Sequence, residues 1–278
     1  MNDSLIAPTV ITAPAAPTVR PRTSPMKPLR DTWLIYQRSL MLTLRNPIWV
    51  FVGLTQPIAF LLLFGPLLKG IAVAGGGSGD NAYNLFVPGL LVQLALFGTM
   101  FVGFGLIAEL RAGVVERMRV TPISRGSMLL GRTLRDITVL VVQAFLLIAL
   151  SIPFGLTIDP ASLVVVLVLV ALIGLALAPI SYALGLALKT EDALAPLLNF
   201  VSLPLLLLSG ILLPMALAPG WLQSIASLNP LSHAVDAARA LFNGQFTDPV
   251  VVTGVALMGV LAVLAVWVGS RAFGRAVS

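Results

Sequence analysis

Long uncharged stretches alternate with short charged ones along most of this chain. A membrane-spanning helix needs roughly 20 apolar residues to cross about 30 Å of hydrocarbon. Uncharged windows of that length are found at 46–68, 81–108, 137–158, 160–188 and 249–270. Each of these windows predicts one transmembrane helix.

A sixth uncharged window, 193–235, is too long for a single helix. Its second half contains Pro214, Pro219-Gly220 and Asn229-Pro230, and backbone broken in this way faces lipid only where protein or water satisfies its polar groups. We therefore predict one span over about 193–213, followed by an external re-entrant or interfacial segment. The expected fold is an all-α integral membrane protein with six transmembrane helices.

Composition supports a membrane location. Hydrophobic residues make up 58% of the chain and charged residues only 10%, whereas a soluble domain carries about 25% charge. The net charge of +6 does not indicate nucleic-acid binding, because the basic residues flank apolar windows instead of gathering on a polar face. The chain has no cysteine, which excludes disulfides and thiolate metal sites.

The positions of the basic residues predict the orientation. Lys and Arg near span ends collect on the cytoplasmic side of a membrane. With six spans, every Lys and Arg except Lys69 and Arg239 falls on one side. We therefore expect a cell-membrane protein with both ends in the cytoplasm. The expected division is a disordered proline-containing tail (1–26), an amphipathic helix (27–45), the six-span domain (46–271) and a cytoplasmic C-terminus (272–278).

The segment 27–45 is predicted to form a helix lying in the cytoplasmic interface. Its aromatic and aliphatic residues share one helical face: Trp33, Tyr36, Leu40 and Thr43/Leu44. Its polar residues lie largely away from that face: Arg30, Asp31, Gln37, Arg38 and Arg45. Such a division is typical of interfacial helices. The alternative is a plain cytosolic extension of the first span.

The charged segment 109–132 lies between the second and third predicted spans. A short helix is expected from about Gly113, with Val115 and Met118 on one side and ionic side chains around it, and Pro122 disfavours helix at Thr121. A rigid helix joining two spans would act as a lever for a partner that grips it. The alternative is an ordinary loop whose charges only set the orientation.

This segment closely resembles the cytoplasmic signature of type-2 ABC exporter permeases of the daunorubicin-resistance kind. The matching positions are Glu109, Gly113, Glu116, Arg117, Thr121, Pro122, Ser124 and Arg125. The departures, Val114, Val115 and Met118, keep apolar or similarly sized side chains. A second match lies outside, at Ser209-Gly210, Pro214, Pro219-Gly220-Trp221, Asn229-Pro230-Leu231 and His233.

The resemblance implies a complex of two membrane subunits, with a homodimer favoured, and two cytoplasmic ATPase subunits that hold ATP and Mg. This chain itself would bind no cofactor, and it contains no phosphate-loop pattern. Substrates would be hydrophobic drugs, antibiotics, lipids or lipid-linked glycans moved outward. The coupling residues implied are Glu109, Arg111, Gly113, Val115, Glu116, Arg117, Met118, Arg119, Thr121, Pro122 and Arg125.

The uncharged windows by definition hold no Asp, Glu, Lys or Arg, which argues against an ion-coupled carrier. Their mid-span polar residues either line a pathway or hydrogen-bond between helices. The candidate pathway residues are Gln56, Pro57, Gln93 and Asn199.

The external segment is expected to hold a helix of about 12 residues, too short to cross. Asn229 is a good N-cap, Pro230 suits the first helical position, and Asn243-Gly244 is a plausible end. The candidate outer-gate residues are Pro219, Trp221, Asn229, Pro230, His233, Asp236 and Arg239. The alternative is an interfacial helix with a solvated polar face, and a single His without Cys or carboxylate neighbours predicts no metal site.

Two other classes remain open. A membrane-embedded lipid-modifying enzyme would need clustered Asp, His or Arg at the membrane surface, and the one such cluster is 109–125, with two acids and many bases. A non-catalytic assembly protein is the third reading.

Overall fold

A computed structural model of the chain describes residues 27–74, 82–114, 124–211, 215 and 218–276. Within these ranges six helical segments are long and apolar enough to cross a membrane, and no strand occurs. They are α2 (Ile48–Ala74), α3 (Ala82–Met100) with α4 (Val102–Arg111), α6 (Arg125–Ser151) with the short 3-10 helix η1 (Ile152–Phe154), α7 (Pro160–Leu188), α8 (Glu191–Leu208) and α11 (Pro249–Ala276). The predicted all-α membrane fold with six spans is confirmed.

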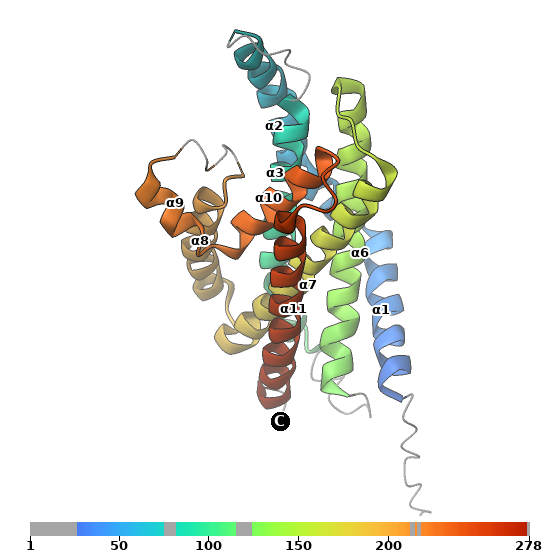
Figure 1. Cartoon of the computed structure of the whole chain (residues 1–278). Helices are drawn as coiled ribbons and strands as arrows, with labels where there is room; N and C mark the ends of the chain where they lie inside the picture. The colour runs from blue at the N-terminus through green and yellow to red at the C-terminus, as the bar shows by residue number, and fades with distance from the viewer. Residues whose placement is uncertain (1–26, 75–81, 115–123, 212–214, 216–217, 277–278) are drawn as a thin grey trace, which may run out of the picture.

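Helix α7 lies at the centre of the bundle, where it contacts α11, α6, α3 and α4 (Figure 1). Its start is specified locally, because the Asp159 side chain accepts a hydrogen bond from Ala161 N (3.1 Å) and Pro160 occupies the first helical position. It ends at Lys189, whose φ of 59° is left-handed. The first described residues of α1 and the last of α11 lie at the same end of the bundle (Figure 1).

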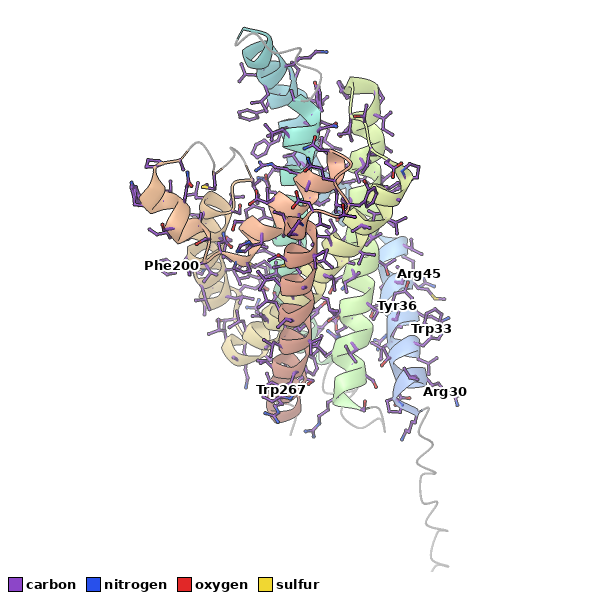
Figure 2. The ribbon with its side chains drawn as sticks, in the orientation of Figure 1. Arg30, Trp33, Tyr36, Arg45, Phe200 and Trp267 are labelled. Carbon is purple, nitrogen blue, oxygen red and sulfur yellow. The ribbon has the colours of Figure 1, made fainter. Side chains whose placement is uncertain are left out.

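The predicted N-terminal helix is present as α1 (Lys27–Arg45). It runs alongside the first half of α6, not across the ends of the spans (Figure 1). Ile35 is buried against α6 at Gly131, and the Tyr36 hydroxyl lies 3.2 Å from that of Thr138. Trp33 lies on the outer side of α1 and is 53% exposed (Figure 2). The exposed surface of α1 thus carries large apolar side chains together with Arg30, Arg38 and Arg45, a combination that suits a helix at a membrane interface.

The second predicted span is two helices. The helical hydrogen-bond ladder is interrupted at Phe101, between α3 and α4. The Ser181 hydroxyl of α7 compensates for the interruption, because it donates to Met100 O (2.6 Å) and accepts from Gly103 N (2.9 Å). A side chain that replaces lost ladder bonds is a recognised cause of a local helix break.

Charged residues do occur in the helices of the candidate spans, which corrects the expectation from the uncharged windows. Helix α6 begins at Arg125, not near Ile137, and carries Arg132 and Asp136 into the packed interior. Glu109 likewise belongs to α4. The windows ended at these charges, whereas the helices continue through them: Arg132 pairs with Glu109 of α4, and Asp136 is bonded by Arg135 of its own helix and by Tyr182 of α7.

Two short helices, α9 (Gly220–Ala226) and α10 (Pro230–Phe242), separate α8 from α11. The Asn229 side chain accepts from Leu231 N (3.0 Å), Pro230 is the first residue of α10, and Gly244 follows its end with a φ of 75°. These features confirm the predicted cap and end of this helix. Most of α10 is buried against α11, α3 and α7, so it belongs to the core of the protein.

Candidate functional site

Five side chains from three helices form a charged junction near the end of the bundle where α6 begins. Arg132 of α6 donates to Glu109 of α4 (2.5 Å), Arg135 pairs with Asp136 (3.1 Å), and the Tyr182 hydroxyl of α7 donates to Asp136. The Arg132 side chain is only 6% exposed. A buried guanidinium of this kind is stable only when paired and hydrogen-bonded. We call these five residues the cytoplasmic junction, a name that rests on the orientation predicted from the positions of Lys and Arg.

Further contacts tie the same end of the bundle together. Arg111 at the end of α4 pairs with Glu191 at the start of α8 (3.2 Å). Arg125 at the start of α6 donates to Gly274 O of α11 (2.5 Å). Gly113 has a left-handed φ of 66° directly after α4, which is where glycine commonly ends a helix. The two flanks of segment 115–123 are therefore joined to α6, α7, α8 and α11.

Four predicted coupling residues can be placed: Glu109, Arg111, Gly113 and Arg125 lie on these flanks. The others lie outside the described residues: Val115, Glu116, Arg117, Met118, Arg119, Thr121 and Pro122. Five residues of these contacts were not predicted from the sequence: Arg132, Arg135, Asp136, Tyr182 and Glu191. A signal existed for α6, since Arg132, Asp136 and Gln143 recur at intervals of four and seven residues and share one helical face.

Helices α4 and α7 approach each other closely just above the junction. A Cβ on Gly103 would lie 2.6 Å from Ser181 O, and a Cβ on Gly185 would lie 3.0 Å from Gly103 O. Small residues at such contacts let helix backbones pack tightly in a membrane. Helix α4 is therefore packed directly against α7 at this point.

Three of the four predicted pathway residues line one cavity. Gln56 and Pro57 of α2 and Gln93 of α3 face a space of about 380 Å³ between α2, α3 and α6. Gln143, Arg135 and Asp136 line its α6 wall, and Phe97 and Phe101 line its other side. The cavity thus borders the cytoplasmic junction, with which it shares Arg135 and Asp136. We call it the α2–α6 cavity.

Asn199 is placed elsewhere. Its amide nitrogen donates to Ala195 O of its own helix, α8 (3.0 Å), and it does not line the α2–α6 cavity. The neighbouring Phe200 is 78% exposed and points away from the bundle (Figure 2). Asn199 and the three cavity residues therefore do not form one site within this chain.

The predicted outer-gate residues divide into a buried set and an exposed set. Arg239 is buried and donates to Leu85 O (3.1 Å) and to Gly210 O (2.7 Å). Asn229 is also buried, and its amide donates to Leu205 O (2.8 Å). The reading of this helix as having a solvated polar face is therefore wrong for Arg239, because its charge is used to satisfy backbone carbonyls of α3 and of the turn after α8.

The remaining gate residues are more exposed. Trp221 is 66% exposed, and the His233 ring lies 3.0 Å from Ser227 O. Asp236 lies 3.8 Å from Arg239, and its side chain is 56% exposed. Burial lowers the pKa of Arg239 and Asp236 opposes that change, while burial raises the pKa of Asp236. The described residues contain no group of three or more His, Cys, Asp or Glu side chains placed to hold a metal.

Comparison with known proteins agrees with this architecture. Residues 30–243 match the ABC-2 type transporter family. The chain is 29% identical over 217 residues to a putative transport permease, ycf38, of Cyanophora paradoxa, covering 77% of this chain and 75% of that protein. It is 30% identical over 209 residues to the daunorubicin resistance ABC transporter permease protein DrrB1 of Streptomyces coeruleorubidus, covering 74% and 73%.

A third relative covers more of the chain. It is the probable doxorubicin resistance ABC transporter permease protein DrrC of Mycobacterium tuberculosis, with 24% identity over 238 residues, or 85% of this chain and 86% of that protein. The family match spans all of the described helices from α1 to α10. Because it covers well over half of the sequence and agrees with the six-span fold, this chain belongs to the ABC-2 type transporter family of membrane permeases.

Proposed function

We propose that this chain forms the translocation path of an ATP-driven exporter, as one of two identical membrane subunits served by two cytoplasmic ABC ATPase subunits. ATP and Mg would bind to the ATPase subunits and not to this chain. The proposed cargo is a hydrophobic or amphiphilic compound, such as a drug, an antibiotic, a lipid or a lipid-linked glycan. Two relatives are named for daunorubicin and doxorubicin resistance, which supports a drug-like cargo.

The cytoplasmic junction is the observation that carries this proposal. Segment 115–123 holds the proposed contact residues for the ATPase, and its flanks are the end of α4 and the start of α6. Glu109 and Arg132 join these two helices directly, and Arg111 and Arg125 extend the contacts to α8 and α11. A push on the segment would therefore reach several spans at once. Interfaces packed in this way switch between discrete arrangements instead of deforming continuously.

The test uses the complex itself. The chain is co-expressed and co-purified with a candidate ABC ATPase from the same genome and reconstituted in liposomes, and uptake of daunorubicin into the liposome lumen is measured with and without external Mg-ATP. ATP-dependent accumulation is expected, and it should vanish when the phosphate-loop lysine of the ATPase is replaced by alanine. An ATPase that neither co-purifies with the chain nor drives any transport would contradict the proposal.

The proposed orientation places both ends of the chain in the cytoplasm of a cell whose plasma membrane holds the protein. The absence of native cysteine makes labelling clean. Thr23→Cys and Ser78→Cys variants are treated in intact cells with a membrane-impermeant maleimide. We expect labelling of Ser78→Cys alone before lysis and of both variants after lysis. Labelling of Thr23→Cys in intact cells would overturn the orientation.

A further inference from the structure

Gln93 lines the α2–α6 cavity, and its side-chain amide lacks hydrogen-bond partners. It is 1% exposed, and neither its amide nitrogen nor its amide oxygen has a hydrogen-bond partner among the described residues. A buried polar group without a partner destabilises the folded chain. A side chain kept in this condition while it lines a cavity of about 380 Å³ indicates a ligand that supplies the missing bonds.

Other groups on the same walls also have unused bonding capacity. Arg135 lines the cavity, and its Nε is buried without a partner. Pro57 has no N–H, so the carbonyl of Gly53, another wall residue, lacks its usual donor four residues later. Gln143 donates its amide N–H to Val50 O (2.8 Å). The walls therefore offer donors and acceptors together.

The charge on these walls is balanced. The guanidinium of Arg135 lies 3.1 Å from the carboxylate of Asp136, so the pair presents little net charge. A phosphate group can only accept hydrogen bonds and an ammonium group can only donate them. Neither group satisfies both ends of the Gln93 amide. An amide or a hydroxyl-bearing head does so, because each both donates and accepts.

The remaining wall is flat and apolar. The rings of Phe97 and Phe101 are stacked, with centroids 6.1 Å apart and planes 19° apart. Phe101 stacks in turn on Phe104, at 5.8 Å and 12°. Such faces suit the apolar body of a bound molecule. The volume of the cavity is within the range of sites that bind drug-sized ligands.

We propose that the α2–α6 cavity binds a neutral amphiphile, with an amide or polyol head against Gln93 and an apolar body against Phe97 and Phe101. This binding site goes beyond the proposed function, because it is argued from the cavity alone and its ligand is not identified with the exported compound. The head makes the hydrogen bonds that Gln93 lacks in this chain. Anionic and cationic amphiphiles of the same length are disfavoured.

The test compares three probes on the full-length chain in lipid nanodiscs. Each probe has the same octyl chain with a photoreactive diazirine, and the heads are a glucamide, a phosphate and a primary ammonium. Labelled peptides are quantified by mass spectrometry across a concentration series. We expect saturable labelling of α2, α3 and α6 by the glucamide, at concentrations at least about tenfold lower than for either charged probe. Equal or stronger labelling of these helices by a charged probe would overturn the proposal.

A substitution at Gln93 locates the head. Gln93→Leu should weaken glucamide labelling by about tenfold or more, because the paired amide is lost. Thr99→Val is the matched control, since Thr99 is buried on the same helix, bonds to Ala95 O of its own helix and does not line the cavity. Unchanged labelling in Gln93→Leu, or an equal loss in Thr99→Val, would refute the assigned head position.

Stability separates a binding role from a folding role. Without probe, Gln93→Leu should melt at the same temperature as the wild type or at a higher one, because an unpaired buried amide is removed. A lower melting temperature would show that Gln93 serves folding instead, and the comparison of heads on the wild-type chain would then decide the proposal alone.

The proposal and the proposed function can fail separately. ATP-driven transport by the complex, with no glucamide labelling of the cavity, would contradict the cavity proposal and support the proposed exporter function. Saturable labelling that depends on Gln93, in a complex that shows no ATP-dependent transport of any compound, would support the binding site and contradict the proposed exporter function.

Discussion

The two ends of the helix bundle are held together by different kinds of contact. At the end that we assign to the cytoplasm, ion pairs join different helices, as in Glu109–Arg132 and Arg111–Glu191, beside the bond from Arg125 to Gly274 O. At the opposite end, the described ion pair Asp236–Arg239 lies within one helix, and buried side chains bond mainly to backbone carbonyls. Arg239 donates to Leu85 O and Gly210 O, and Asn84 donates to Phe242 O (3.2 Å).

The difference bears on how each end moves. Ion pairs between long side chains re-form with new partners after a helix shifts, because their charged tips reach several positions. A side chain bonded to a fixed carbonyl has no such choice, and breaking the bond leaves a buried polar group unpaired. We therefore expect the end that carries the interhelical ion pairs to rearrange more readily than the end that holds α9 and α10.

The largest loss of stability should follow from Arg239→Met. The change leaves the carbonyls of Leu85 and Gly210 without their donor in a buried setting, and each buried acceptor left unsatisfied costs about 1–3 kcal/mol. Thermal melting in nanodiscs measures the loss. Arg239→Lys should recover only part of it, since one ammonium cannot reproduce the forked guanidinium. A melting temperature equal to that of the wild type would show that the outer end is not held by this residue.

A smaller loss is expected from Gly103→Ala in the cytoplasmic half. The added Cβ would lie 2.6 Å from Ser181 O, so α4 and α7 must move apart, and overpacking of this kind costs about 1–3 kcal/mol. Gly105→Ala is the matched control on the same helix, because no atom lies within 4 Å of its Cβ position. The control should be neutral or more stable, by up to about 1 kcal/mol. Equal melting of the two variants would count against a close helix contact here.

Glu109→Gln should separate coupling from stability. The amide keeps a hydrogen bond to Arg132 but loses the charge, and because the Glu109 side chain is 39% exposed, we expect a stability loss of only about 1 kcal/mol. ATP-driven transport should fall by about tenfold or more, since the link between α4 and α6 is weakened. Transport and ATPase activity are measured on the same reconstituted complex. Wild-type transport by this variant would argue that the junction is only structural.

The smallest effect is expected at the exposed pair. The Arg111 and Glu191 side chains are 57% and 45% exposed, and surface pairs of this kind contribute about 0.2–1 kcal/mol. Arg111→Gln should therefore hardly change the melting temperature. Any change should disappear as salt is raised, because exposed charges are screened. A large loss of stability that persists at high salt would show that this pair behaves like a buried ion pair.

The sequence predicts most of the fold because membrane spans obey a simple rule of length and polarity. The bounds of α1, the six spans and the cap of α10 at Asn229 all follow from local patterns. The same rule misplaces the start of α6, because it treats Arg132 and Asp136 as the end of a span. Whether a charge ends a helix or pairs inside the bundle depends on residues far away in the chain, such as Glu109 and Tyr182.

The candidate site is predictable in part for the same reason. Polar residues in apolar windows stand out, so Gln56 and Gln93 could be chosen from the sequence. Their meeting in one cavity, and the separation of Asn199 from them, depend on how α2, α3 and α8 are arranged. The burial of Arg239 could likewise not be predicted from the sequence, because its partners are backbone carbonyls, which almost every residue type carries.

The hydroxyl of Ser181, which bridges Met100 O and Gly103 N, gives the second span a mechanical property that a continuous helix would lack. The break at Phe101 lets α3 and α4 meet at an angle while the backbone groups on both sides of it stay hydrogen-bonded. In the proposed exporter, we expect a force on α4 to be absorbed first as a change of this angle, before α3 has to move.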